Sequence, residues 1–134
     1  MHHLVVATQG QGLTEVTTPI RAWLANQGAT TGLLTVWCRH TSASLLVQEN
    51  ADPDVRADLL TFFRHVAPES TLYRHQAEGA DDMPAHIKAA LTQTHLSIPL
   101  TRGELLLGTW QGIYLFEHRS TPHRRELIVH LLYD

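Results

Sequence analysis

Two segments in the C-terminal third of the chain carry apolar residues at consecutive positions. Successive side chains of a strand point to opposite faces, so these segments predict strands that are covered on both sides. We expect helices to cover one face, and either a second sheet or neighbouring subunits to cover the other. The segments are Leu105-Leu106-Leu107 and Ile113-Tyr114-Leu115-Phe116.

The order of strand-like and helix-like segments decides the fold class. Three helices are predicted to begin at Pro19, Pro53 and Pro84, each after a capping residue: Thr18, Asp52, and Asp82 or Met83. Because strands and helices do not alternate regularly, the order favours an α+β domain with mixed or antiparallel, sandwich-like sheets over a doubly wound fold. The expected strands are 4–8, 13–17, 33–39, 44–49, 96–100, 104–107, 110–117 and 125–132.

Each predicted helix has an apolar stripe that we expect to face the core. In the second helix, which has the clearest pattern, Asp52 and Asp54 complement the helix dipole in the first turn. Residues 67–82 show neither the apolar periodicity of a helix nor that of a strand, which predicts a long exposed loop. The stripes are Ile20, Trp23 and Leu24 in the first helix, Val55, Leu59, Phe62, Phe63 and Val66 in the second, and Ile87, Ala90 and Leu91 in the third.

Composition limits the function classes. A chain of 134 residues with 43% apolar residues is enough for one domain, residues 1–134, and too short for two. Charged residues make up 17%, against about 25% in typical domains, so we expect copies of the chain to cover part of the surface. The net charge, 10 − 13 = −3, argues against nucleic-acid binding. No apolar run would span a bilayer and no targeting pattern opens the chain, which predicts a cytoplasmic protein without a membrane partner.

Histidine is the unusual residue, with ten copies, as many as lysine and arginine together. Three lie where a core role is least natural: His40 at a strand end, His75 in the long loop and His86 at a helix start. The positive end of the helix dipole disfavours a charged ring at His86. The loop could bring His75 and His86 around one divalent ion, with an aspartate orienting a ring nitrogen. The alternative is hydrogen-bonded surface histidines, since no HExxH or paired CxxC motif is present.

Four other positions are candidates for chemistry. Glu49 ends a strand and is a possible base, but a tight hairpin at residues 41–43 would place it roughly 16 Å from His40, so the two would meet only across a subunit boundary. Glycines on either side of Trp110 and Gln111 predict a bulge or a close backbone approach that aims these side chains into a pocket; a core tryptophan is the alternative. Arg125 could bind a phosphate, or belong to a solvated charge pair with Arg124.

Taken together, four ordered blocks resemble the signatures of the YjbQ-like family. The resemblance implies a small α+β homotrimer labelled as a secondary thiamine-phosphate synthase. Two regions depart from the family pattern: Ala80 follows Glu78-Gly79 where many relatives have asparagine, and residues 117–124 replace a compact Gly-Pro-Arg turn. The blocks are His40–Ala43, Glu49–Val55, Asp81–Leu91, and Gly103 with Leu107–Tyr114.

Carried onto this sequence, the resemblance implies a site centred on histidines. His40, His75 and His86 would hold a divalent metal, zinc or magnesium, and Glu49 and His40 would be catalytic. The substrate-binding residues would be Thr41, Ser42, Trp110, Gln111 and Arg125.

Three functions remain open from the sequence. The first is a metal-dependent enzyme acting on a small phosphorylated metabolite, in its most specific form joining a pyrimidine-methyl diphosphate to a thiazole phosphate. No carboxylate cluster for magnesium and no glycine-rich phosphate loop accompanies it. The second is a metal-dependent phosphate-ester hydrolase. The third is a non-catalytic trimer that binds a metal or a metabolite, in which a metal site would be closed by a fourth protein ligand.

Overall fold

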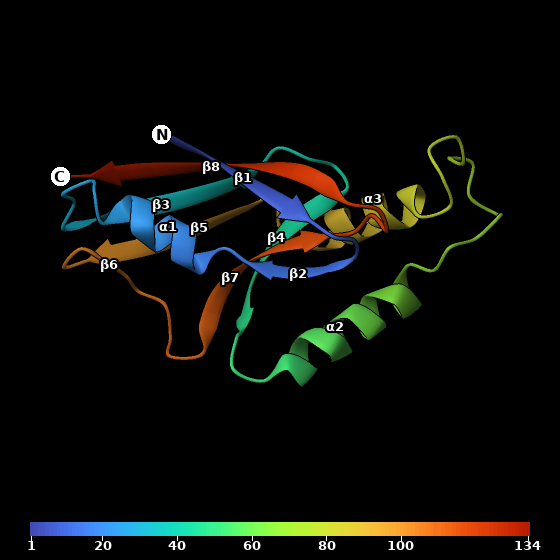
Figure 1. Cartoon of the computed structure of the whole chain (residues 1–134), viewed down its shortest axis with the longest axis horizontal. Coiled ribbons are helices and arrows are strands. Elements are labelled where there is room, and N and C mark those ends of the chain that lie inside the picture. The colour runs from blue at the N-terminus through green and yellow to red at the C-terminus, as the bar shows by residue number, and fades with distance from the viewer.

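A computed structural model describes residues 1–134 and contains two sheets and three helices (Figure 1). The elements follow one another in the predicted order, which confirms the α+β class. None of the helices combines the length and the apolar character needed to span a bilayer. The elements are β1 (His2–Thr8), β2 (Gly12–Glu15), α1 (Thr17–Leu24), β3 (Thr31–Cys38), β4 (Ala43–Glu49), α2 (Pro53–Val66), α3 (Asp82–Leu91), β5 (His95–Thr101), β6 (Glu104–Leu105), β7 (Gln111–Glu117) and β8 (His123–Tyr133).

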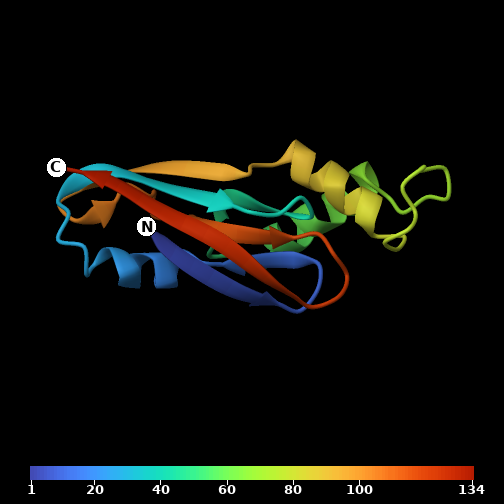
Figure 2. The ribbon, with the colours of Figure 1, turned by 90° about the horizontal axis from the view of Figure 1, so that it is seen from above.

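Both sheets are antiparallel throughout. The larger has the order β1-β8-β3-β5-β6 and the smaller the order β2-β7-β4. One core of 17 buried residues joins the two sheets and α1; it includes Leu34 of β3, Ile113 of β7 and Ile20 of α1. This is the predicted sandwich-like arrangement. The molecule is elongated, and α3 with the loop before it lies at the end away from the chain termini (Figure 2).

Strand β7 is buried on both faces, as the sequence predicts. Ile113 and Leu115 face the core between the sheets. On the other face, the Phe63 ring of α2 packs edge-on against Phe116 with centroids 5.2 Å apart, and Arg56 of α2 donates a hydrogen bond to the Tyr114 hydroxyl at 3.2 Å. Helix α2 therefore covers the outer face of the small sheet.

The same prediction is wrong for residues 105–107. Strand β6 ends at Leu105, which is buried, and Leu106 is 57% exposed. The strand is short because only its first two residues pair with β5. The predicted turn before it is present, with Arg102 and Gly103 both at positive φ (52° and 78°).

Residues 41–43 do not form the tight hairpin on which the expected distance between His40 and Glu49 depends. Strand β3 belongs to the larger sheet and β4 to the smaller, so residues 39–42 cross from one sheet to the other. Strand β4 pairs instead with β7, in a register that sets Ala43 opposite Glu117 and Glu49 opposite Gln111. The crossing brings residues 40–42 to one end of the sandwich, beside the start of α3.

Two of the three predicted helix starts are displaced. Asp52 caps α2 by accepting a hydrogen bond from the Asp54 amide at 2.9 Å, as predicted. Helix α1, however, begins at Thr17, whose hydroxyl accepts from the Ile113 amide at 2.8 Å and ties the first turn to β7. Helix α3 begins at Asp82, because contacts elsewhere in the fold engage this side chain and remove it from a capping role.

The inward face of α3 differs from the prediction. The helix buries Asp82, Pro84, Ala85, Lys88 and Ala89, whereas Ala90 and Leu91 of the predicted stripe are exposed. Polar contacts to other elements rotate the charged face inward. The stripe of α2 is only partly covered: none of its residues is fully buried, and Phe62 and Val66 are exposed.

Candidate metal centre

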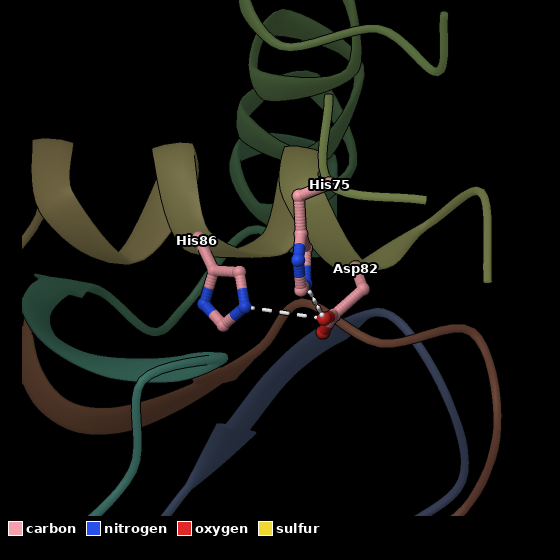
Figure 3. A group of neighbouring side chains, drawn as sticks. All are labelled: His75, Asp82 and His86. Atoms are coloured by element: carbon pink, nitrogen blue, oxygen red, sulfur yellow. Dashed lines mark hydrogen bonds and ion pairs between the residues drawn. The ribbon is translucent and has the colours of Figure 1, made fainter. Parts of the chain in front are cut away.

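Three side chains converge where the long loop enters α3 (Figure 3). His75 comes from the loop, Asp82 opens the helix, and His86 lies one turn further along the same helix face. One potential ligand atom from each lies within 4.8 Å of the other two. The predicted convergence of His75 and His86 is therefore present, with Asp82 between them.

Asp82 is the centre of this group. Its Oδ2 atom lies 2.6 Å from His75 Nε2 and 3.2 Å from His86 Nε2, and its Oδ1 atom accepts a hydrogen bond from Arg119 at 2.8 Å. Burial by itself would raise the pKa of the Asp82 carboxyl, but the hydrogen bond with His75 and the positive charges of His86 and Arg119 hold this pKa below its ordinary value. Asp82 is thus a carboxylate at neutral pH.

The tautomer of His86 follows from its second contact. His86 Nδ1 lies 2.8 Å from the Thr41 carbonyl oxygen, which can only accept a hydrogen bond, so Nδ1 carries a proton. If the ring is neutral, Nε2 presents a lone pair to Asp82 Oδ2, which is also a hydrogen-bond acceptor. Two acceptors so close require a positive centre between them, either a second proton on the ring or a metal ion. A backbone carbonyl that fixes the tautomer of a histidine is a common support for a metal ligand, so the residues fit a divalent ion.

Arg119 fixes the acidic side of the group. Besides Asp82, its guanidinium donates to Asp81 Oδ2 at 2.9 Å and to the Glu78 carbonyl at 2.8 Å. Burial would raise the pKa of Asp81, but hydrogen bonds from Ser120 and Arg119 outweigh it and lower the pKa to about 2. Arg119 therefore holds the end of the loop against the start of α3.

A buried ion pair fixes the opposite side. Arg125 Nε donates to Glu117 Oε1 at 2.8 Å, and Arg125 Nη2 donates to Glu117 Oε2 and, at 3.0 Å, to the Ser42 hydroxyl. Burial would raise the pKa of Glu117, but the bonds from Arg125 and Thr8 keep it below its ordinary value. Because Ser42 follows Thr41, this pair positions the carbonyl that orients His86. The Arg125 donors thus point into the protein.

His40 is not among the three converging side chains. Its Nε2 atom accepts a hydrogen bond from the Glu126 amide at 2.7 Å, and burial, with the charge of Arg125, lowers its pKa, so the ring is neutral at pH 7. Thr41 and Ser42 border the group through the contacts described above.

The remaining predicted site residues lie at the far end of the small sheet. Glu49 pairs with Gln111 in register, six positions from the Ala43–Glu117 pair, which is about 20 Å along the strands. Glu49 accepts a hydrogen bond from the Asp52 amide at 3.0 Å, and Gln111 accepts one from the Gly108 amide at 2.7 Å. Trp110 is 62% exposed. One chain therefore holds two separate polar groups.

Gly112 is approached by side chains and not by another backbone segment. A Cβ atom there would lie 2.6 Å from Glu15 Oε2, so a larger residue would require this carboxylate to move. Glu15 also accepts hydrogen bonds from Thr17 at 2.8 Å and Asn50 at 3.3 Å.

The sequence predicts an aspartate beside the histidines but does not say which one, and it predicts no role for Arg119. Asp82 is also a candidate helix cap; its spacing of four residues from His86 places both side chains on one helix face. Arg119 reaches Asp82 across 37 positions, and no local pattern marks such a contact.

His118 lies beside this region on the end of β7. Its Nε2 atom is 2.8 Å from the Ser44 hydroxyl, and its Nδ1 atom is buried without a hydrogen-bond partner. Burial and, next, the positive charge of Lys88 lower the pKa of His118 to about 3. The folded protein therefore holds this ring neutral.

Comparison with known proteins gives one family. The model of the family described as UPF0047 protein YjbQ-like matches residues 2–134. The UPF0047 protein sll1880 of Synechocystis is 57% identical over 129 residues, 96% of this chain and 88% of that protein. The UPF0047 protein YjbQ of Escherichia coli O157:H7 is 43% identical over 129 residues, covering 96% of this chain and 94% of its own length.

Solved structures agree with the fold. A crystal structure of an uncharacterized conserved protein of the yjbq/upf0047 family from Clostridium acetobutylicum has a TM-score of 0.91 at 34% identity, over 98% of this chain and all of that one. The conserved hypothetical protein TT1486 from Thermus thermophilus has a TM-score of 0.88 at 36% identity, again over 98% of this chain and all of that one.

The state of His118 predicts how stability depends on pH. The unfolded chain protonates this ring near pH 6.5, whereas the folded chain does so only near pH 3, so the unfolded state binds more protons between these values. The free energy of unfolding should decrease as the pH is lowered across this window, by up to about 1.4 kcal/mol per pH unit from this group. Urea denaturation of wild type and His118→Gln at pH 7, 6, 5 and 4 measures it.

The free energy of unfolding of His118→Gln should depend less steeply on pH than that of wild type. His130→Gln, at an exposed histidine of β8, is the control and should keep the wild-type slope. Equal slopes for wild type and His118→Gln would contradict the neutral buried state.

Proposed function

We propose that this protein, which belongs to the UPF0047 YjbQ-like family, binds a divalent metal ion through His75, Asp82 and His86 and acts there on a small phosphorylated metabolite. The observation that supports the proposal is the position of His86 Nε2, which lies 3.2 Å from the Asp82 carboxylate while the Thr41 carbonyl holds a ring proton on Nδ1. Imidazole nitrogen and carboxylate oxygen are both ligands that zinc accepts.

The ligand chemistry favours zinc over magnesium. Two imidazole nitrogens and one carboxylate oxygen suit zinc, whereas magnesium prefers oxygen ligands alone. Three protein ligands leave a coordination position open, which is typical of catalytic zinc sites, while structural sites are closed by a fourth protein ligand. When bound, such an ion polarises a phosphoryl oxygen or lowers the pKa of a water. A set of three protein ligands with one open coordination position therefore favours an enzyme over a purely structural metal site.

The surrounding residues would keep the ligands in place. Arg119 holds Asp82 by one oxygen and leaves the other directed at both histidines. The Thr41 carbonyl sets the ring plane of His86. The side chains of His75 and His86 are 43% and 31% exposed, so a dissolved metabolite can reach this face of the group.

The most specific form of the reaction is the transfer implied by the family resemblance. In it, the thiazole nitrogen of one substrate bonds to the methylene carbon of the pyrimidine substrate, and the bond from that carbon to the diphosphate oxygen breaks. The alternative for the same centre is hydrolysis of a phosphate ester, which transfers the phosphoryl group to water. The two reactions differ in the leaving anion, diphosphate in the first and phosphate in the second.

We further propose that the active protein is a homotrimer whose sites lie between copies. Glu49 and Trp110 lie about 20 Å from the histidine end of the small sheet in one chain, so they would serve the centre of a neighbouring copy. Exposed large apolar side chains support such contacts. They include Trp37, Phe62, Leu91, Trp110, Leu132 and Tyr133.

Removal of a ligand tests the metal site directly. Purified protein, stripped with chelator and reloaded with zinc, should bind about one equivalent per chain, and His75→Ala and His86→Ala should each lose it while remaining folded. Arg119→Met should weaken zinc affinity roughly 10–100-fold, because it releases a ligand from its orienting partner. Elemental analysis and competition with a chromophoric chelator measure these effects. His130→Ala is the matched control and should bind as wild type; normal zinc content in both ligand variants would refute the site.

The leaving anion tests the reaction. Zinc-loaded protein with pyrimidine-methyl diphosphate and thiazole phosphate should release one diphosphate per joined product, and His86→Ala should release none. Coupled assays for diphosphate and for phosphate, with chromatography of the product, measure both anions. Phosphate release from a phosphate ester, without joining, would favour the hydrolase. Release of neither anion would contradict catalysis and leave a non-catalytic metal-binding protein.

Mixed oligomers test the position of the site. Light scattering should give a mass of about 45 kDa, three times the chain mass of 15.0 kDa. If Glu49 serves a neighbouring copy, Glu49→Gln and His86→Ala should each be inactive alone but regain part of the activity when refolded together. A mass near 15 kDa, or no recovery in verified mixed oligomers, would contradict a shared site.

A further inference from the structure

The only lysine of the chain is buried and has no partner. Lys88 lies on the inward face of α3 and is 2% exposed. Its ammonium group forms none of the hydrogen bonds or ion pairs of the structure; only its backbone carbonyl is engaged, by Thr92. The ammonium group itself is not fully buried, because it lies at the wall of a cavity, where it can bind an anion.

Lys88 lines a cavity of about 240 Å³ between α2 and α3. The walls come from the end of α2, the residues that follow it, the turn between β1 and β2, and α3. Figure 1 shows α2 and α3 together at the end of the molecule away from the termini. The lining residues are Gln11, Arg64, Ala67, Pro68, Glu69, Pro84 and Lys88.

The guanidinium-bearing residue Arg64 lines the same cavity. Arg64 is held there by a hydrogen bond from its Nε atom to Gln11 Oε1 at 3.2 Å, and it forms no ion pair with a carboxylate. The Glu69 carboxylate also lines the cavity; like Arg64 it is exposed, and it bonds to neither cation. The cavity wall therefore carries two cationic side chains and one carboxylate.

The charge balance points in the same direction. Lys88 and Arg64 carry like charges on the wall of one cavity, so they repel each other. A multiply charged anion beside both groups would remove this repulsion, because each cation would then face negative charge.

We propose that this cavity is a phosphate-binding site in which the Lys88 ammonium and the Arg64 guanidinium hold the phosphate oxygens. It is separate from the metal ligands, and binding of inorganic phosphate there requires no metal. The cavity is smaller than those that enclose drug-sized ligands, which suits a phosphate group with a small attached body. Its use as the subsite for the phosphate of the metabolite rests on the function proposed above.

Thermal unfolding in the presence of phosphate tests the site. With EDTA present, inorganic phosphate should raise the Tm of wild-type protein by several degrees above sodium chloride of equal ionic strength, because a ligand that binds only the folded state stabilises it. Acetate, a singly charged carboxylate, should act more weakly. Lys88→Met and Arg64→Gln should lose the phosphate response, and Arg102→Met, in the exposed β5–β6 turn, should keep it.

The variant itself should fold. Lys88→Met removes a positive charge that has no ion-pair partner and retains the side-chain length, so without phosphate its Tm should equal or exceed that of wild type. A wild-type Tm that phosphate raises no more than chloride does, or an unchanged response in Lys88→Met, would overturn the proposal. So would an effect of Lys88→Met on oligomer mass with no phosphate response in wild type, since a neighbouring copy would then supply the counter-charge.

Amine labelling tests the same site without a variant. Because Lys88 is the only lysine, its side chain and the N-terminal amine are the only amines that an amine-selective acetylating reagent can modify. Phosphate should slow Lys88 acetylation at least several-fold, measured by peptide mass spectrometry, and leave the rate at the N-terminus unchanged. Equal slowing at both amines, or none, would contradict phosphate binding at Lys88, whatever the outcome of the metal experiments.

Discussion

The buried ion pair between Glu117 and Arg125 is the contact on which the candidate site depends. It joins β7 of the small sheet to β8 of the large one, and it engages Thr8 of β1 and Ser42 of the crossing segment. Removing one partner would leave a buried charge, at a cost of about 3–5 kcal/mol. Because the pair also holds the chain that carries the Thr41 carbonyl, the closure of the sandwich and the orientation of His86 have one physical cause.

Three consecutive residues at the end of β7 contact three different parts of the fold. Glu117 points between the sheets, His118 points to the opposite side, where it contacts Ser44 and Phe116, and Arg119 reaches the start of α3. Alternation along the strand places the first two on opposite faces. The end of β7 thus sets the position of the crossing segment and of Asp82, so the geometry of the proposed metal ligands depends on a strand more than on the loop.

The order of the elements was predictable from the sequence because it depends on local periodicity, and so was the burial of Ile113–Phe116 on both faces. The inward face of α3 was not predictable. The pattern of Ile87, Ala90 and Leu91 predicts which side is buried from hydrophobicity alone. In the structure, contacts of Asp82 across the fold determine which side of the helix turns inward. The crossing at residues 39–42 occurs because β4 pairs with β7 in the smaller sheet. A local turn pattern does not predict this long-range pairing. For the same reason, His75 and His86 could be paired by their spacing, but Arg119 could not be assigned to them.

Helix α3 places two unlike groups on its buried side. Asp82 faces the histidines, and Lys88, six residues later, faces the cavity beside α2, so the two lie about 9 Å apart along the helix axis. A rigid helix fixes this separation more firmly than two loops would. A metabolite that carries a phosphate at one end could therefore be held by Lys88 while its other end reaches the metal ligands, and the length of the ligand, more than any single contact, would then select the substrate.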